Sequence, residues 1–68
     1  MRILYDRIVG LDADGKQVHY IEASGSSTED KPTEESFGWP IADGSSVLES
    51  DTAKVFFFNE AQTDWLEA

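Results

Sequence analysis

The chain has 68 residues, of which 14 are acidic and 5 are basic, so its formal net charge is −9, and it contains no cysteine. This length suffices for one small domain, disulfide bonds are excluded, and no run of residues is apolar enough to span a membrane. The charge argues against direct binding of nucleic acid or of an anionic membrane surface. We interpret it first as a solubilising surface, and we expect the chain to be made and folded in a cytoplasm.

The first 23 residues predict a β-hairpin. Strand-forming side chains are frequent in residues 2–11 and again in residues 16–23. Between them, Asp12-Ala13-Asp14-Gly15 has the composition of a hairpin turn in which glycine adopts a positive φ. The same aspartates resemble the start of a calcium loop, but a strand begins where the further ligands of such a loop belong. A hairpin turn is therefore the favoured interpretation, and a cation site is the alternative.

The second of these strands carries apolar residues on both faces. Val18 and Tyr20 share one face, whereas His19 and Ile21 share the other. This pattern suggests that both faces are partly covered. We interpret the single histidine as an ordinary strand residue rather than as a general base or a metal ligand.

Residues 24–44 predict a loop that is longer than is usual inside a compact domain. Its aromatic tip, Phe37-Gly38-Trp39-Pro40, suggests that it is ordered. Phe37, Trp39 and Ile41 either fold back to cap the core or stand out as a contact site. The loop also carries an acidic cluster, which we interpret as solvated charge, with contact to a basic partner as the alternative: Glu29, Asp30, Glu34 and Glu35.

Residues 45–68 contain the densest apolar stretch and predict a meander of short strands. A turn at Asp51-Thr52-Ala53 leads into a strand over Lys54–Asn59, on which aromatic side chains point to both faces. Phe56 and Phe58 share one face, and Val55 and Phe57 share the other. A second turn precedes a last short strand that begins at Trp65. A helix over residues 60–68 is the alternative, but nine residues form a marginal helix.

The aromatic residues raise the question of how such a small chain is stabilised. Burial in a domain of this size barely offsets the conformational entropy lost on folding, so either the aromatics pack well or a partner or self-association adds burial. We expect Phe56, Phe58 and Trp65 in the core. For Phe57 and Trp39, core and interface remain open alternatives.

The predicted fold is all-β. It is a small single-domain antiparallel sheet of two hairpins, with about four to five short strands in total. An N-terminal hairpin covers residues 1–23, a long ordered loop covers 24–44, and a C-terminal meander covers 45–68.

Several short motifs occur in a fixed order from Ser27 onward: Ser27-Thr28-Glu29-Asp30-Lys31-Pro32-Thr33, Gly44-Ser45, Glu49-Ser50-Asp51-Thr52-Ala53-Lys54-Val55-Phe56, Phe58-Asn59-Glu60 and Trp65. Together they resemble a module of phage and prophage structural proteins, such as small head- or tail-associated proteins and segments of tail fibres. The resemblance covers about two-thirds of the chain. Ala53 stands where the module often has glycine, and alanine tolerates positive φ poorly. The Phe37–Pro40 segment is not part of the module.

The resemblance implies a structural or accessory protein that acts through protein–protein interaction and enters a virion, with no catalytic residue to carry over. The residues agree, because no nucleophile–base pair, metal cluster or phosphate loop is recognisable, so no enzyme activity and no cofactor are predicted. The partner is another protein or a second copy of the chain. The predicted interaction surface comprises Phe37, Trp39, Phe57, Glu29, Asp30, Glu34 and Glu35.

The high negative charge suggests a second function class. An acidic chain can act as a decoy that mimics nucleic acid and binds a basic protein surface. This alternative requires carboxylates that line one face at phosphate-like spacing.

Overall fold

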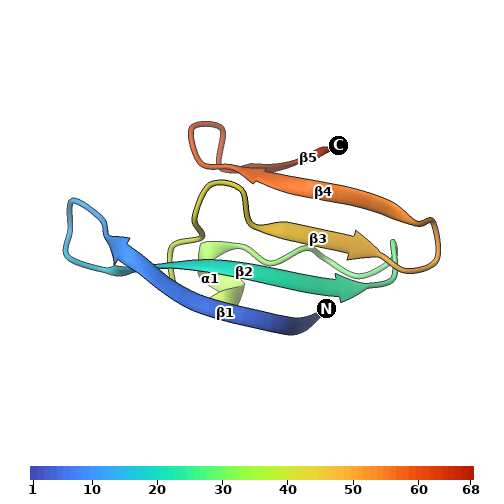
Figure 1. Cartoon of the computed structure of the whole chain (residues 1–68), viewed down its shortest axis with the longest axis horizontal. Coiled ribbons are helices and arrows are strands. Elements are labelled where there is room, and N and C mark those ends of the chain that lie inside the picture. Colours follow the sequence, from blue (N-terminus) through green and yellow to red (C-terminus); the bar gives the residue numbers. More distant parts are fainter.

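The computed structural model describes the whole chain, Met1 to Ala68, as one five-stranded sheet with a single short helix (Figure 1). The elements in chain order are β1 (Arg2–Leu11), β2 (Gln17–Gly25), α1 (Glu34–Phe37), β3 (Ser46–Glu49), β4 (Lys54–Asn59) and β5 (Asp64–Glu67). The strands lie side by side in the order β1-β2-β3-β4-β5. The all-β prediction is therefore confirmed, and so is the last short strand, which forms in preference to a helix.

One strand pair departs from the predicted antiparallel sheet. β1–β2, β3–β4 and β4–β5 are antiparallel, but β2 and β3 run parallel. Antiparallel neighbours can be joined by a tight turn, whereas parallel neighbours need a crossover of about a dozen residues or more. The segment between β2 and β3, residues 26–45, is long enough to return the chain to the same end of the sheet. We call this segment the crossover.

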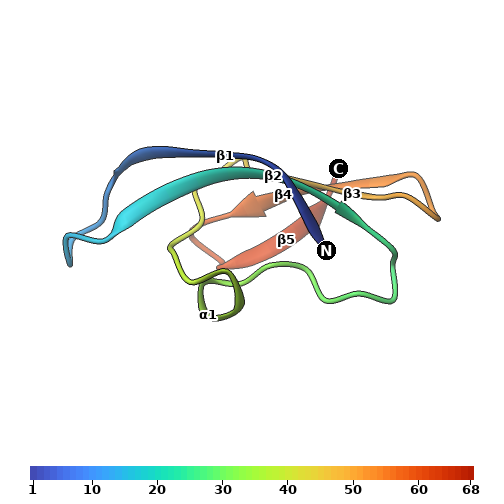
Figure 2. The same ribbon diagram turned by 90° about the horizontal axis from the view of Figure 1, so that it is seen from below.

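The crossover packs against one face of the sheet only. Figure 2 shows the sheet edge-on, with α1 and most of the crossover below it and no segment above it; the end of the crossover rises to the sheet where it leads into β3. Backbone hydrogen bonds fasten the crossover to β2, because His19 N donates to Pro40 O and Ala42 N donates to His19 O. We call the face under the crossover the covered face, and the opposite one the open face.

The core lies between the covered face and the crossover. Its centre is Ile21, Ile41 and Phe58, with Phe37 and Trp65 packed against it. Val47 is also fully buried. The crossover therefore folds back to cap the core through Phe37 and Ile41, and the prediction that Phe58 belongs to the core is confirmed.

The helix α1 was not predicted, because one turn shows no helical periodicity. It is formed by local hydrogen bonds instead. Thr33 Oγ1 accepts from Ser36 N, and Ser36 Oγ accepts from Thr33 N, so the two residues form a capping box. Gly38 ends the helix in the left-handed conformation, with φ of 97°.

Two turns determine which side chains reach which face. In the β1–β2 turn, Asp12 Oδ1 accepts hydrogen bonds from the backbone N–H groups of Asp14 and Lys16, which confirms the hairpin turn. In the β3–β4 turn, Ala53 has a φ of 58°, a conformation that favours glycine. With this turn, Val47 pairs with Phe56 and Ser46 pairs with Phe57. The predicted alternation of the β4 aromatics between two faces is therefore confirmed.

Candidate interaction surface

The open face carries a continuous row of side chains across all five strands. Paired residues on neighbouring strands point to the same face, so the register places Tyr5, Glu22, Ser46, Phe57 and Leu66 in one row. Within this row, Tyr5 is 45% exposed, Phe57 47% and Leu66 39%. Apolar side chains from β1, β4 and β5 thus face solvent together.

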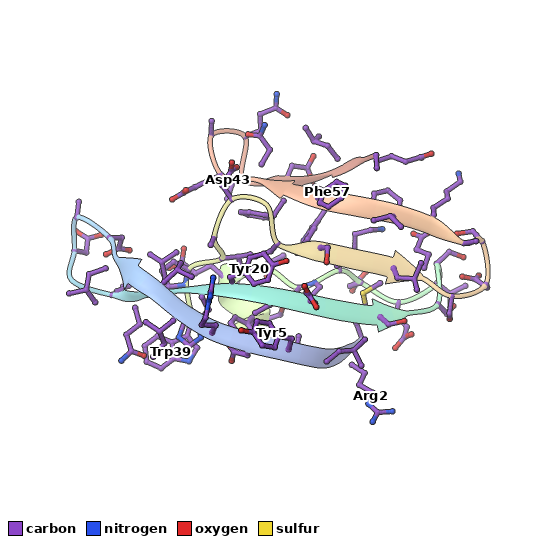
Figure 3. All side chains as sticks on the ribbon, in the orientation of Figure 1. Arg2, Tyr5, Tyr20, Trp39, Asp43 and Phe57 are labelled. Atoms are coloured by element: carbon purple, nitrogen blue, oxygen red, sulfur yellow. The ribbon has the colours of Figure 1, made fainter.

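Two further rows flank it. On one side Ser24 pairs with Leu48 and Leu48 with Val55, and on the other Arg7 pairs with Tyr20. Leu48 is also exposed, at 42%. Figure 3 shows Tyr5, Tyr20 and Phe57 in front of the ribbon, on the side away from the crossover. We define the open-face patch by its exposed and half-buried apolar side chains: Tyr5, Tyr20, Leu48, Val55, Phe57 and Leu66.

The β1–β2 end of this patch is held in place by contacts among its own side chains. The rings of Tyr5 and Tyr20 pack edge to face at 6.1 Å, and the guanidinium of Arg7 lies 6.0 Å from the Tyr20 ring. The Tyr20 hydroxyl donates to Glu22 Oε2 at 2.8 Å. This hydrogen bond to the Glu22 carboxylate raises the pKa of Tyr20. The aromatic end of the patch is therefore preorganised.

The residues of the predicted interaction surface do not form one surface. Phe57 lies on the open face, whereas Phe37 and Trp39 belong to the crossover on the other side. Trp39 is exposed but stacks on His19 at 5.1 Å, and Phe37 meets the same ring edge-on at 5.6 Å. Both aromatics therefore help to hold the crossover against β2. Of the three predicted aromatic residues, only Phe57 lies on the open face.

The four predicted acidic residues also separate. Glu34 and Glu35 line a shallow hollow together with Trp39, whereas Glu29 and Asp30 line another beside Trp65. The acidic cluster thus splits into two pairs along the crossover.

His19 is a buried residue of the covered face. Its Nδ1 donates to Asp6 Oδ1 at 2.7 Å, and its buried Nε2 has no hydrogen-bond partner. The ring is enclosed by the two crossover aromatics. The hydrogen bond with Asp6 fastens β1 to β2.

Carboxylates on the covered side stabilise the crossover. Glu49 accepts from Lys31 Nζ at 2.9 Å and from Thr52, and these hydrogen bonds lower its pKa. Asp51 accepts from the side chain and backbone of Ser27, which lowers its pKa as well. These acidic groups therefore have partners within the fold.

Most of the open-face patch was not predicted from the sequence. Tyr5, Tyr20, Leu48 and Leu66 were seen only as strand residues. The alternation around Phe57 did separate the two faces of β4, but only the strand order shows which other residues share its face.

Comparison with known proteins adds no relative: no family model matches the chain, and neither a curated protein nor a solved structure is significantly similar to it. No group of three or more histidine, aspartate or glutamate side chains is arranged to hold a metal ion. The one helix is too short to cross a membrane.

Proposed function

We propose that this chain is a non-enzymatic structural or accessory protein of a phage or prophage, and that it acts by binding a protein surface through its open face. The observation that supports this is the open-face patch itself: apolar side chains on neighbouring strands with no part of the chain above them. Contiguous exposed apolar patches mark interfaces in soluble proteins, and aromatic residues and arginine are enriched there.

The edges of the sheet are less suited to binding than its face. β1 has irregularities between Ile3 and Tyr5 and between Ile8 and Gly10, where the pairing with β2 shifts. Such bulges twist an edge strand and hinder the addition of another strand. The other edge, β5, has only four residues, two of them acidic. The open face is therefore better suited to binding a partner than either edge of the sheet.

The arrangement of the carboxylates gives the nucleic-acid decoy less support. The acidic side chains are spread over turns, the crossover and the sheet edges. Several of them pair with cations of the same chain, among them Glu29, Glu34, Glu49 and Glu67. A decoy needs free carboxylates in rows on one surface, whereas the rows of the open face contain only two carboxylates, Glu22 and Asp64.

Site-specific photo-cross-linking tests the binding surface. A cross-linking phenylalanine derivative replaces Phe57 in a host that carries the complete source genome, and mass spectrometry identifies the product. Leu11 is the matched control, because it is 69% exposed on β1 but lies outside the open-face patch. We expect a defined cross-link from position 57, to a particle protein or a second copy, and none from position 11. No defined product at position 57 would refute the proposed surface.

The phage assignment has a separate test. We expect the genes that flank the coding sequence to encode capsid or tail proteins. Flanking genes for metabolic enzymes would contradict it. A phage accessory protein is made in the host cytoplasm and then joins the virion. The protein itself should therefore be recovered with purified particles.

A further inference from the structure

We propose that the open face is closed by a second copy of this chain, packed sheet against sheet about a twofold axis parallel to the strands. In this arrangement Arg7 of each copy lies opposite Asp64 of the other. The inference rests on the proposed function, because it takes the open face as the binding surface. It goes further in naming the occupant and its orientation.

The size of the face fits a dimer. The chain measures 36 × 20 × 17 Å along its principal axes, and the open face lies across the two longer ones. The rectangle that encloses the chain in this view is about 720 Å², of the same order as the ~800 Å² that each partner contributes to a stable interface of standard size. Two sheets that pack face to face, about 10 Å apart, would enclose the aromatic side chains of both copies.

The charges favour a second copy over a different basic protein. The net charge is −9, so two copies repel each other unless their acidic residues lie away from the contact. The three rows of the open face contain only two carboxylates, Glu22 and Asp64, and Glu22 already accepts from the Tyr20 hydroxyl. The remaining acidic residues belong to the covered side, the crossover and the turns. A contact through the open face therefore keeps most of the negative charge outside.

The two arginines form no ion pair within the fold. All three lysines form ion pairs with carboxylates of the same chain. By contrast, Arg2 and Arg7 form no ion pair, although the chain has 14 acidic residues. Arg7 pairs with Tyr20 and lies over its ring on the open face of β1. Arg2, which pairs with Ser24, extends beyond the β1 edge of the sheet (Figure 3). Unpaired guanidinium groups on an interaction face fit carboxylates of an incoming surface.

The register also selects the orientation. Asp64 on β5 pairs with Asn59 on β4, and Arg7 on β1 pairs with Tyr20 on β2. Both pairs lie two residues from the row of Tyr5 and Phe57, on the same side of it. A twofold axis parallel to the strands places β1 over β5 of the second copy, and so Arg7 over Asp64. The other face-to-face arrangement, with the axis across the strands, places β1 over β1 and brings arginines together. Opposite charges therefore favour the first arrangement.

Sedimentation velocity over a concentration series tests the dimer. We expect the wild type to form a dimer of twice 7.6 kDa at about 100 μM. Phe57→Asp should raise the dimer dissociation constant at least about 30-fold, as expected for an interface hot spot. Leu11→Asp, which adds the same charge outside the patch, should leave it unchanged. Phe57→Thr retains a strand-forming residue and should weaken the dimer to the same extent. It takes the place of Phe57→Asp in the test if that variant does not fold.

A charge exchange tests the orientation. Arg7→Asp and Asp64→Arg should each weaken the dimer about tenfold or more, since each change creates a repulsive contact twice per dimer. The double variant Arg7→Asp/Asp64→Arg should restore it to within about threefold. The two residues lie at opposite edges of a five-stranded sheet, about 19 Å apart, so rescue requires contact between copies.

The outcomes separate the two proposals. A monomeric wild type that still cross-links another protein from position 57 would overturn the dimer but leave the proposed function intact. A dimer that survives Phe57→Asp would overturn the open face as the contact between copies, and only the absence of a defined cross-link from position 57 would overturn the proposed function as well. A dimer that the double exchange does not restore would overturn the orientation, and assemblies larger than a dimer would point to edge-to-edge pairing instead.

Discussion

Two neighbouring phenylalanines on β4 lie on opposite faces of the sheet, so they allow a direct comparison of the two faces. Phe58 is 7% exposed and packs in the core with Ile21 and Ile41, its ring 5.0 Å from that of Trp65. Phe57, one residue earlier, is 47% exposed, with Ser46 and Leu66 beside it on the strands. One strand therefore carries a phenylalanine that stabilises the core on one face and a second phenylalanine that is exposed for contact with a partner on the other. In this chain, the apolar content exceeds what its own core buries.

The two faces also differ in how they are fastened. On the covered face, Trp65 Nε1 donates to Pro32 O at 2.7 Å, and Lys31 lies 3.9 Å from the Phe56 ring centre while it pairs with Glu49. These contacts tie the crossover to strands far away in sequence. On the open face, side-chain contacts join only residues of the same strand or of neighbouring strands. A change on the covered face should therefore affect folding, and a change on the open face should affect association.

The largest expected effect comes from truncation of the core phenylalanine. Phe58→Ala should lower the free energy of unfolding by about 3–5 kcal/mol, because it removes a buried ring and leaves a cavity. Phe57→Ala should lower it by less than about 1 kcal/mol in dilute solution, where the chain is monomeric. Urea unfolding followed by tryptophan fluorescence measures both. Equal losses would show that the two faces do not differ as described.

A smaller effect is expected where β1 is fastened to the covered face. Asp6→Ala leaves the buried Nδ1 of His19 without its acceptor and should cost about 1–2 kcal/mol. His19→Phe removes the imidazole together with its unpartnered Nε2 and keeps the aromatic contacts with Phe37 and Trp39. It should therefore be nearly neutral in thermal unfolding. If His19→Phe destabilised the fold as strongly as Asp6→Ala, the imidazole would have a role beyond packing.

The β3–β4 turn, which determines the faces of the β4 aromatics, contains local strain. Ala53→Gly should raise the free energy of unfolding by about 1 kcal/mol, because alanine at a positive φ is strained and glycine is not. Chemical unfolding at a fixed low concentration measures the gain, with Ala61→Gly in the next turn as the control. A loss of stability at position 53 would mean that the alanine methyl contributes packing.

The smallest expected effect is a loss of stability in acid. Hydrogen bonds from Lys31 and Thr52 lower the pKa of Glu49, and bonds from Ser27 lower that of Asp51, in the folded state. The stability they contribute is fully present above the ordinary carboxyl pKa values of 4.5 and 3.8, and is lost as the pH falls through the lower folded values. Urea midpoints measured from neutral to acidic pH should fall accordingly. Glu49→Gln should reduce this pH dependence, while Glu35→Gln, an exposed control, should not.

The local patterns of the sequence predicted much of the fold. The alternation around Phe57 separated the faces of β4, the Asp12–Gly15 turn predicted the first hairpin, and Trp65 marked the last strand. Each of these depends on residues close in the chain. The parallel pairing of β2 with β3 depends on the path of the crossover, which no local pattern records.

The candidate surface was harder to predict for the same reason. Trp39 and Phe57 looked equivalent as surplus aromatics, yet one stacks on His19 and the other faces solvent. Which face the crossover covers is decided by long-range packing of Ile41 and Phe37. Tyr5 and Leu66 join the row of Phe57 only through the strand order, so their shared role was not visible in the sequence.

The most direct measurement is the urea midpoint of the wild type and of Phe57→Asp, each at a low and a high protein concentration. Association of folded chains stabilises them by mass action. We expect the wild-type midpoint to rise with concentration and the Phe57→Asp midpoint to stay constant, with equal slopes in both. A wild-type midpoint that does not change with concentration, or a Phe57→Asp midpoint that rises as much as that of the wild type, would contradict self-association through the open face.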